Sequence, residues 1–230
     1  MAGANSGSGK QTKYYSLKAK VDAQNTPFFA LSEKNADGKW VTTEKFDTMI
    51  GFLVSAEIKA KEFEGAKFNT FVFKMEDDNE TSLIEFTHNS VTHSLINTLA
   101  SDCNKINNYS IQVYRKQSKD KQYWNGGVSI KANGSEEGMK WHIDPQSAPK
   151  KEAVTKADGQ PFTVQGKQVW DDSKLRVFWE EIFVSKIQNA LNSAAAKPAQ
   201  TPPTNTATTN STPPVFQGSN DNDDLQDLPF

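Results

Sequence analysis

The sequence predicts a mainly β domain with two helices, followed by a long polar tail. Alternation of apolar and polar residues, which is typical of half-buried strands, recurs many times between residues 13 and 170, and helical spacing occurs in only two places. Hydrophobic residues make up 36% of the 230 residues, which is low for a fully folded chain, and the segments poor in hydrophobic residues lie at the two ends. We therefore expect four regions: a flexible leader at 1–12, a folded domain at 13–196, a disordered linker at 197–220 and an acidic tip at 221–230.

The first predicted strand covers residues 13–21, where Tyr15 and Leu17 would face a core. The outward positions carry an aromatic ring and two cations, at Tyr14, Lys18 and Lys20. This mixture suits a surface that stacks nucleic-acid bases and neutralises phosphates. It also suits an ordinary solvent-exposed face, and both interpretations stay open.

Several later segments show the same strand pattern. We expect strands at 28–31, 40–43, 47–61, 67–75, 81–87 and 139–143, and a small hairpin at 161–170. In the segment 47–61, we expect Ile50, Phe52, Val54, Ala56 and Ile58 to share one face, with Gly51 marking a bend or bulge. The segment 67–75 is apolar on both faces, which predicts a central strand.

Residues 109–117 and 121–131 predict a hairpin with a short turn at 118–120. Its outward face would carry Tyr114, Lys116, Lys121, Tyr123 and Lys131. A turn this short would make Tyr114 and Tyr123 cross-strand neighbours. We regard this hairpin as the better of the two candidate surfaces for stacking bases, with solvated decoration as the alternative.

Helical spacing appears after the capping pair Asn89-Ser90 and again after Asp171-Asp172, which predicts helices near 90–103 and 172–193. The first apolar stripe consists of Val91, Leu95, Ile96, Leu99, Cys103 and Ile106. The second consists of Leu175, Phe178, Trp179, Ile182, Phe183, Ile187, Ala190 and Leu191. We expect both stripes to serve packing.

Other chemistry is poorly supported by the sequence. His88 and His93 have no cysteine partner nearby and no HExxH pattern, so we expect no metal and no cofactor. The dense acids at 76–78 and 171–172 fit a turn and a helix start better than a magnesium site, so we do not expect an enzyme such as a nuclease. Cys103 is the only cysteine, which excludes an intramolecular disulfide and favours a reducing cytoplasm. No apolar stretch approaches the length of a membrane span.

The most distinctive stretch is the last ten residues. Four aspartates without any Lys or Arg precede an apolar end, and the pattern residues are Asp223, Asp224, Asp227, Leu228, Pro229 and Phe230. The chain carries a net charge of −2, so removing this −4 leaves +2 for residues 1–197. A mildly basic body with an acidic tail fits weak polyanion binding that the tail itself competes with.

This ending resembles the acidic tip of bacterial and phage single-stranded DNA-binding proteins, although Leu225 and Gln226 interrupt the aspartate run. The alternating strands, the intervening helix and the basic aromatic faces likewise favour an OB-type Greek-key barrel with elaborations. The resemblance implies sequence-independent binding of single-stranded DNA in replication, recombination or repair. It also implies that the tip recruits replication or recombination proteins, in the cytoplasm of a host cell if the protein is viral.

Two matters stay open at this level. A homo-oligomer or a cooperative array on DNA is compatible with the sequence. The alternative function is a protein-binding adaptor whose barrel grips protein and whose tail is a docking peptide.

Overall fold

The computed structural model describes residues 10–78 and 80–193. The predicted linker at 197–220, the predicted tip at 221–230 and residues 1–9 of the predicted leader lie outside the described residues. The first strand begins at Gln11, which is two residues earlier than the alternation predicted.

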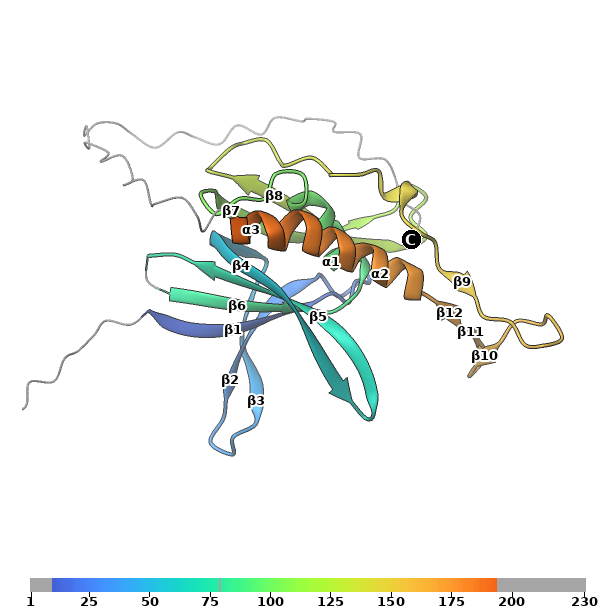
Figure 1. Cartoon of the computed structure of the whole chain (residues 1–230). Helices are drawn as coiled ribbons and strands as arrows, with labels where there is room; N and C mark the ends of the chain where they lie inside the picture. Colours follow the sequence, from blue (N-terminus) through green and yellow to red (C-terminus); the bar gives the residue numbers. More distant parts are fainter. Residues whose placement is uncertain (1–9, 79, 194–230) are drawn as a thin grey trace, which may run out of the picture.

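Eight strands form one curled sheet in the order β3-β2-β1-β6-β5-β4-β7-β8 (Figure 1). All neighbouring pairs are antiparallel except β1 and β6, which are parallel. The strands are β1 Gln11–Lys18, β2 Phe28–Lys34, β3 Trp40–Phe46, β4 Thr48–Phe63, β5 Ala66–Glu76, β6 Glu80–Phe86, β7 Asn108–Gln117 and β8 Trp124–Ala132. The prediction of a mainly β fold is confirmed, and β5 is a central strand as its two apolar faces indicated.

Two helical regions accompany the sheet, as predicted. The first is α1, Ser90–Leu99, which is capped by the Asn89 side chain and ends earlier than expected. The second is a continuous run formed by α2 Ser173–Ile182, the π-helical η2 Phe183–Gln188 and α3 Asn189–Ser193; we call this run the 173–193 helix. Beyond α1, Cys103 is buried as predicted, whereas Ile106 is exposed and belongs to no stripe.

Between β8 and the 173–193 helix the chain forms short elements. They are the 3₁₀ helix η1 Pro145–Ser147 and the strands β9 Glu152–Ala153, β10 Thr163–Val164, β11 Lys167–Gln168 and β12 Trp170–Asp171. The predicted hairpin at 161–170 corresponds to the β10–β11 pair. β9 to β12 form an arm that projects from the body (Figure 1).

The predicted strand at 139–143 is not a strand. Its backbone instead pairs with one buried side chain of α1: the Ile143 amide donates to Asn97 Oδ1 at 3.0 Å, and Asn97 Nδ2 donates to the Ile143 carbonyl at 2.9 Å. The Asn97 side chain therefore satisfies both backbone polar groups of Ile143, while the Met139 and His142 amides donate to the Ile130 and Asn97 backbone carbonyls at 2.7 and 3.0 Å.

The concave face of the sheet holds the core. Tyr15, Ile84 and Phe73 lie opposite one another on β1, β6 and β5, and all three side chains are buried. α1 and the 173–193 helix fill the concavity, with β7 and β8 on the far side of the helices in Figure 1. The sheet thus curls around the helices, and its convex face points to solvent.

For the first half of β4, the prediction of the buried face is wrong: the side chains expected to face the core point to solvent. The ladder with β5 shifts register between Leu53 and Ser55, so Val54 is the extra residue of a β-bulge. One inserted residue exchanges the two faces of a strand. Ala56 is therefore buried after the bulge, whereas Ile50 and Phe52 before it point to the convex face. The predicted bulge exists, but three residues beyond Gly51.

The 173–193 helix is held by one apolar stripe with a spacing of four residues, Trp179, Phe183, Ile187 and Leu191, and all four side chains are buried. In an α-helix with 3.6 residues per turn, side chains four residues apart gradually rotate around the helix axis. The π-helical turns of η2 contain more residues per turn, which reduces this rotation and keeps the stripe on one side of the helix. The Phe183 ring lies 4.8 Å from the Phe71 ring and stacks on Phe73 at 5.6 Å.

A buried polar network fixes the same helix. His88 Nε2 lies 3.0 Å from Glu180 Oε1, and His88 Nδ1 lies 3.2 Å from His93 Nε2. Asn69 of β5 donates to the same Glu180 oxygen at 3.0 Å, and the His93 ring stacks on Trp179 at 5.3 Å. Burial lowers the pKa of His88 and lowers the pKa of His93 to about 3. His93 is therefore neutral in the folded protein at physiological pH.

We predict that Phe183→Ala lowers the free energy of unfolding by about 3–5 kcal/mol, because it removes a fully buried ring from between two others. The adjacent Val184 is partly exposed, so Val184→Ala is the matched control and should cost about 0.5 kcal/mol or less. Urea denaturation measures both. Equal costs for the two variants would show that the helix is not anchored through this stripe.

We also predict a proton-linked loss of stability. His93 has a pKa of about 3 when folded and about 6.5 when unfolded, so below pH ~6.5 the unfolded chain binds an extra proton. The free energy of unfolding should then fall by up to about 1.4 kcal/mol per pH unit between pH ~6 and pH ~3 from this group alone. His93→Gln should make the measured slope shallower by about one proton; an unchanged slope would contradict the buried neutral state.

Candidate nucleic-acid interface

The convex face of β1, β2 and β3 carries a cluster of aromatic and cationic side chains. The strand register places its members on one side of the sheet, because their neighbours Tyr15, Leu31 and Phe29 point to the core. We call this the β1–β3 face; it consists of Tyr14, Lys18, Phe28, Lys34, Trp40 and Lys45.

The cluster has two ends, each with rings and a lysine. At one end, Tyr14 and Trp40 meet edge to face with ring centroids 5.7 Å apart, and Lys34 Nζ lies 5.5 Å from the Trp40 centroid. At the other end, Lys45 Nζ lies 4.8 Å from the Phe28 centroid. The two ends are separated by the length from Tyr14 to Lys18, about 13 Å along a strand. Exposed rings beside cations are what a single-strand stacking platform requires.

The charge on this face is unbalanced. Its outward positions on the three strands include Lys18, Lys34 and Lys45 and no carboxylate. On the convex face of the neighbouring strands, by contrast, lysines pair with glutamates, as in Lys61 with Glu85 and Lys74 with Glu76. The β1–β3 face is therefore the more attractive part of this surface for a polyanion.

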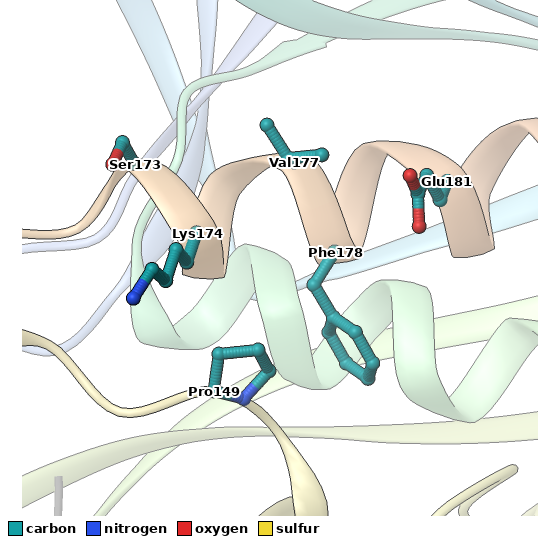
Figure 2. Close-up of a pocket in the computed structure, with 6 residues that line it drawn as sticks. All are labelled: Pro149, Ser173, Lys174, Val177, Phe178 and Glu181. Atoms are coloured by element: carbon teal, nitrogen blue, oxygen red, sulfur yellow. The ribbon is translucent and has the colours of Figure 1, made fainter.

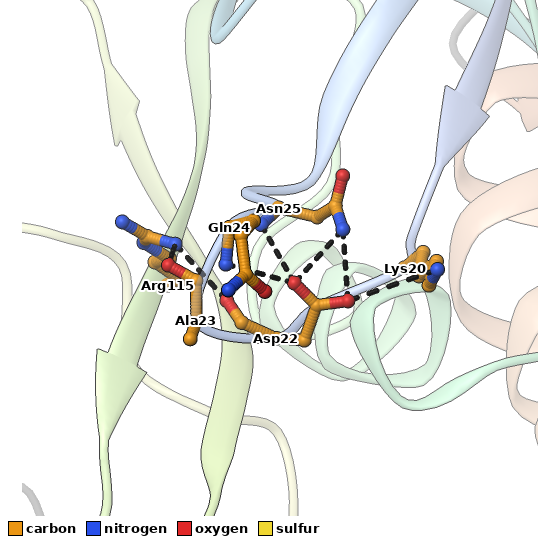
Figure 3. Close-up of polar contacts among 6 residues, drawn as sticks. All are labelled: Lys20, Asp22, Ala23, Gln24, Asn25 and Arg115. Atoms are coloured by element: carbon orange, nitrogen blue, oxygen red, sulfur yellow. Dashed lines mark hydrogen bonds and ion pairs between the residues drawn. The ribbon is translucent and has the colours of Figure 1, made fainter.

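Lys20 lies just beyond β1 and is highly exposed, 3.7 Å from Asp22. Asp22 organises the loop between β1 and β2: one carboxylate oxygen accepts from the Gln24 amide at 2.8 Å and from the Asn25 amide at 2.9 Å. Hydrogen bonds from Asn25 and Gln24 lower the pKa of Asp22. The loop is thus ordered by its own side chain (Figure 3).

Arg115 ties this loop to β7. Its Nη1 donates to the carbonyl oxygens of Asp22 at 3.0 Å and Ala23 at 2.6 Å (Figure 3). Its guanidinium lies 4.7 Å from the Trp124 centroid. Gly126, opposite Arg115, lets β8 approach α1 and the β1–β2 loop, because an added Cβ would lie 2.6 Å from a Val91 methyl group and 2.8 Å from a Val21 methyl group. The arginine serves the scaffold, which leaves lysines as the cations of the β1–β3 face.

The predicted hairpin forms, but its register differs from the prediction. Tyr114 lies opposite Gly127, and the loop covers 118–123, so Tyr114 and Tyr123 are not cross-strand neighbours. The loop is longer because the Ser118 amide and carbonyl bond to Tyr123 and Lys121. Asp120 also accepts from the Gln122 amide at 3.0 Å, and Lys121 adopts a positive φ of 59°.

The aromatic residues of this hairpin are therefore dispersed. The Tyr114 ring lies over Gly127, where an added Cβ would come within 2.6 Å of it, and burial raises the pKa of Tyr114. Lys116 and Lys131 are exposed on the same face, whereas Tyr123 and Lys121 belong to the loop. In sheet order, β7 and β8 are separated from β1 by β4, β5 and β6, so the two predicted surfaces do not lie on adjacent strands.

Sequence analysis missed four members of the β1–β3 face, namely Phe28, Lys34, Trp40 and Lys45. Pairing the segments 28–34 and 40–46 as antiparallel strands would have revealed them, because this pairing puts Lys34 opposite Trp40 and Ala30 opposite Lys45. The short strands predicted there did not extend far enough to reveal that alternation.

A different kind of surface lies beside α2. Val177, Phe178 and Pro149 line an open apolar depression, with Lys174 and Glu181 at its edges (Figure 2). Lys174 is paired with Glu152 across 2.5 Å. This depression offers neither stacked rings nor unbalanced positive charge, so it does not match the predicted chemistry.

The acidic segments have local structural partners. Asp77 accepts from the Glu80 amide at 2.7 Å, and Asp171 accepts from the Ser173 amide at 2.9 Å at the start of α2. Within residues 10–78 and 80–193, no group of three or more His, Cys, Asp or Glu side chains could hold a metal ion. No helix in the same ranges is long and apolar enough to span a bilayer.

Comparison of the chain with protein-family models, with curated proteins and with solved structures found no match. The functional interpretation therefore depends on the geometry and charge of the surface described above.

Proposed function

We propose that this protein binds single-stranded DNA without sequence preference, and that the β1–β3 face is its principal contact. The observation that carries the proposal is the exposed Tyr14–Trp40 pair with Lys18, Lys34 and Lys45 at outward positions of β1, β2 and β3, none of which is a carboxylate. On the neighbouring strand β6, Glu85 lies opposite Ser16 and is paired with Lys61. Rings stack on any base, and lysines neutralise phosphates without reading base edges. Lys20, Lys116, Lys121, Lys131, Tyr114 and Tyr123 would add further contacts.

The strand connections of β4 to β8 support this proposal. The long strand β4 pairs with β5 through most of its length and with β7 through its first residues, and α1 connects β6 to β7. Five strands with a helix between the third and the fourth are compatible with an OB-type arrangement, although β6 pairs with β1 and not with β8. We propose that β4 to β8 form an OB-type core and that β1–β3 and the segments after residue 132 are elaborations.

The acidic tip has a second role in the proposal. Asp221, Asp223, Asp224 and Asp227 compete with DNA for the lysines, and Leu228-Pro229-Phe230 recruits replication or recombination proteins once DNA displaces the tail. The resemblance described above supports this part. The competing hypothesis is an adaptor that binds protein instead of DNA.

We predict that Trp40→Ala weakens binding to oligo-dT by about 5- to 150-fold, because one stacked base contributes ~1–3 kcal/mol. Trp170→Ala is the matched control, because Trp40 and Trp170 are 56% and 55% exposed and Trp170 lies on the arm. Replacing Lys18, Lys34 and Lys45 by alanine should reduce the slope of log K against log salt by about 2, with Lys156→Ala as the lysine control.

Fluorescence anisotropy with labelled oligo-dT and with duplex DNA, at low and high salt, measures these effects. Equal losses for Trp40→Ala and Trp170→Ala would reject the β1–β3 face as the contact. If the wild-type protein fails to bind oligo-dT at low salt, the DNA proposal fails, and the adaptor hypothesis takes its place.

We predict that replacing Asp221, Asp223, Asp224 and Asp227 by asparagine in the full chain strengthens oligo-dT binding at low salt. The gain should vanish at high salt, because the competition is electrostatic. The same titration measures it. An affinity that does not change at low salt would remove the tail from the DNA-binding mechanism while leaving the β1–β3 face untouched.

A further inference from the structure

Two large apolar side chains stand exposed on the convex face between the two predicted surfaces. Ile50 is 62% exposed and Phe52 is 39% exposed, because the bulge at Val54 turns the first half of β4 outward. Neither side chain is needed in the core, where Met49 and Leu53 of the same strand are buried. Exposed apolar residues grouped on one strand indicate a contact surface.

The ladder registers connect these residues to the β1–β3 face. Tyr14 lies opposite Leu83 of β6, and Leu83 lies opposite Lys74 of β5. Lys74 is two residues along β5 from Glu76, which lies opposite Phe52. At about 4.8 Å per strand, Phe52 is about 14 Å from β1 across the sheet, with Leu83 and Lys74 in between.

In the opposite direction across the sheet, the ladder registers lead from Ile50 to β8. We call the whole line of residues from β3 to β8 the path. Ile50 lies opposite Ser110 of β7, and Ser110 lies opposite Lys131 of β8. Lys131 is thus the residue of the β7–β8 hairpin that is in register with Ile50, whereas Tyr114 lies further along β7 and Lys121 and Tyr123 lie in the loop.

The charges along this path suit a phosphate backbone. The Glu76 carboxylate beside Phe52 lies 2.6 Å from Lys74 Nζ and 3.8 Å from Lys10 Nζ, so two lysines compensate one carboxylate. Lys131 adds an exposed cation at the far end. The acidic turn that begins at Asp77 borders the path at the end of β5, so the path runs on the Lys74 side of Phe52.

We infer that Phe52 forms a second stacking station with Ile50 as its apolar neighbour, and that single-stranded DNA crosses the convex face from Trp40 and Tyr14 over Lys74 and Phe52 towards Lys131. The inference rests on the proposed DNA-binding function and adds to it a site and a direction. The strand runs across the β-strands rather than along them. From β3 to β8 the path covers seven strand-to-strand steps, about 34 Å.

The test compares oligo-dT of about 4 and about 16 nucleotides, the limits of the site size of a single OB fold. With the full chain, Phe52→Ala should weaken binding of the longer oligonucleotide about 5-fold or more and should leave the shorter one at the wild-type affinity. Phe52→Tyr keeps a ring and should bind both normally. Phe162→Ala is the matched control, because Phe162 is 41% exposed and lies next to β10 on the arm.

Trp40→Ala distinguishes a failure of the proposed path from a failure of the proposed function, because it should weaken the binding of both the shorter and the longer oligonucleotide. If Trp40→Ala weakens binding and Phe52→Ala equals Phe162→Ala on the longer oligonucleotide, the path is wrong and the proposed function stands. If Trp40→Ala has no effect either, the β1–β3 face is rejected as the contact, and if the wild-type chain does not bind oligo-dT at low salt, the proposed function fails. If the shorter oligonucleotide binds too weakly to titrate, the comparison of Phe52→Ala with Phe162→Ala on the longer one still decides. Thermal melting of each variant checks that a loss of binding is not a loss of folding.

Discussion

The one-residue bulge at Val54 of β4 is the constraint on which the rest of the surface depends. β4 is the longest strand and pairs with β5 and β7, so it joins the two halves of the curled sheet. On one side of the bulge Ala56 faces the core, and on the other side Met49 and Leu53 do. The exchange of faces keeps the concave side apolar from Met49 to Ile58, and it places Ile50 and Phe52 on the convex side.

The polar side chains near the helices have structural roles, whereas the lysines and rings of the convex face are exposed to solvent. The 173–193 helix fills the concavity through Phe183, and burial beside this helix lowers the pKa of both His88 and His93. Arg115 is used inside the scaffold, where it binds the carbonyl oxygens of the β1–β2 loop. The convex face at β1–β3 retains compact, mobile lysine charges and exposed rings, which is the division that sequence-independent binding requires.

Local patterns predicted much of this architecture. The alternation around Tyr15 and the stripe through Phe183 correctly assigned strand, helix and buried face, because side-chain periodicity depends only on the local backbone. Ile50, Phe52 and the Tyr114–Tyr123 pairing were misassigned, since a bulge and a longer loop change register without changing composition. Trp40 escaped notice because its importance depends on Tyr14, 26 residues away, and only the sheet topology brings their rings to 5.7 Å.

The central claim is that the convex face of the sheet contacts single-stranded DNA. Ultraviolet crosslinking of the full chain to oligo-dT, followed by mass spectrometry of the crosslinked peptides, tests it without any substitution. Our account predicts crosslinks in the peptides that contain Tyr14, Trp40 and Phe52. Crosslinks confined to the arm at 152–171 or to the outer side of α2 around Val177 would contradict it.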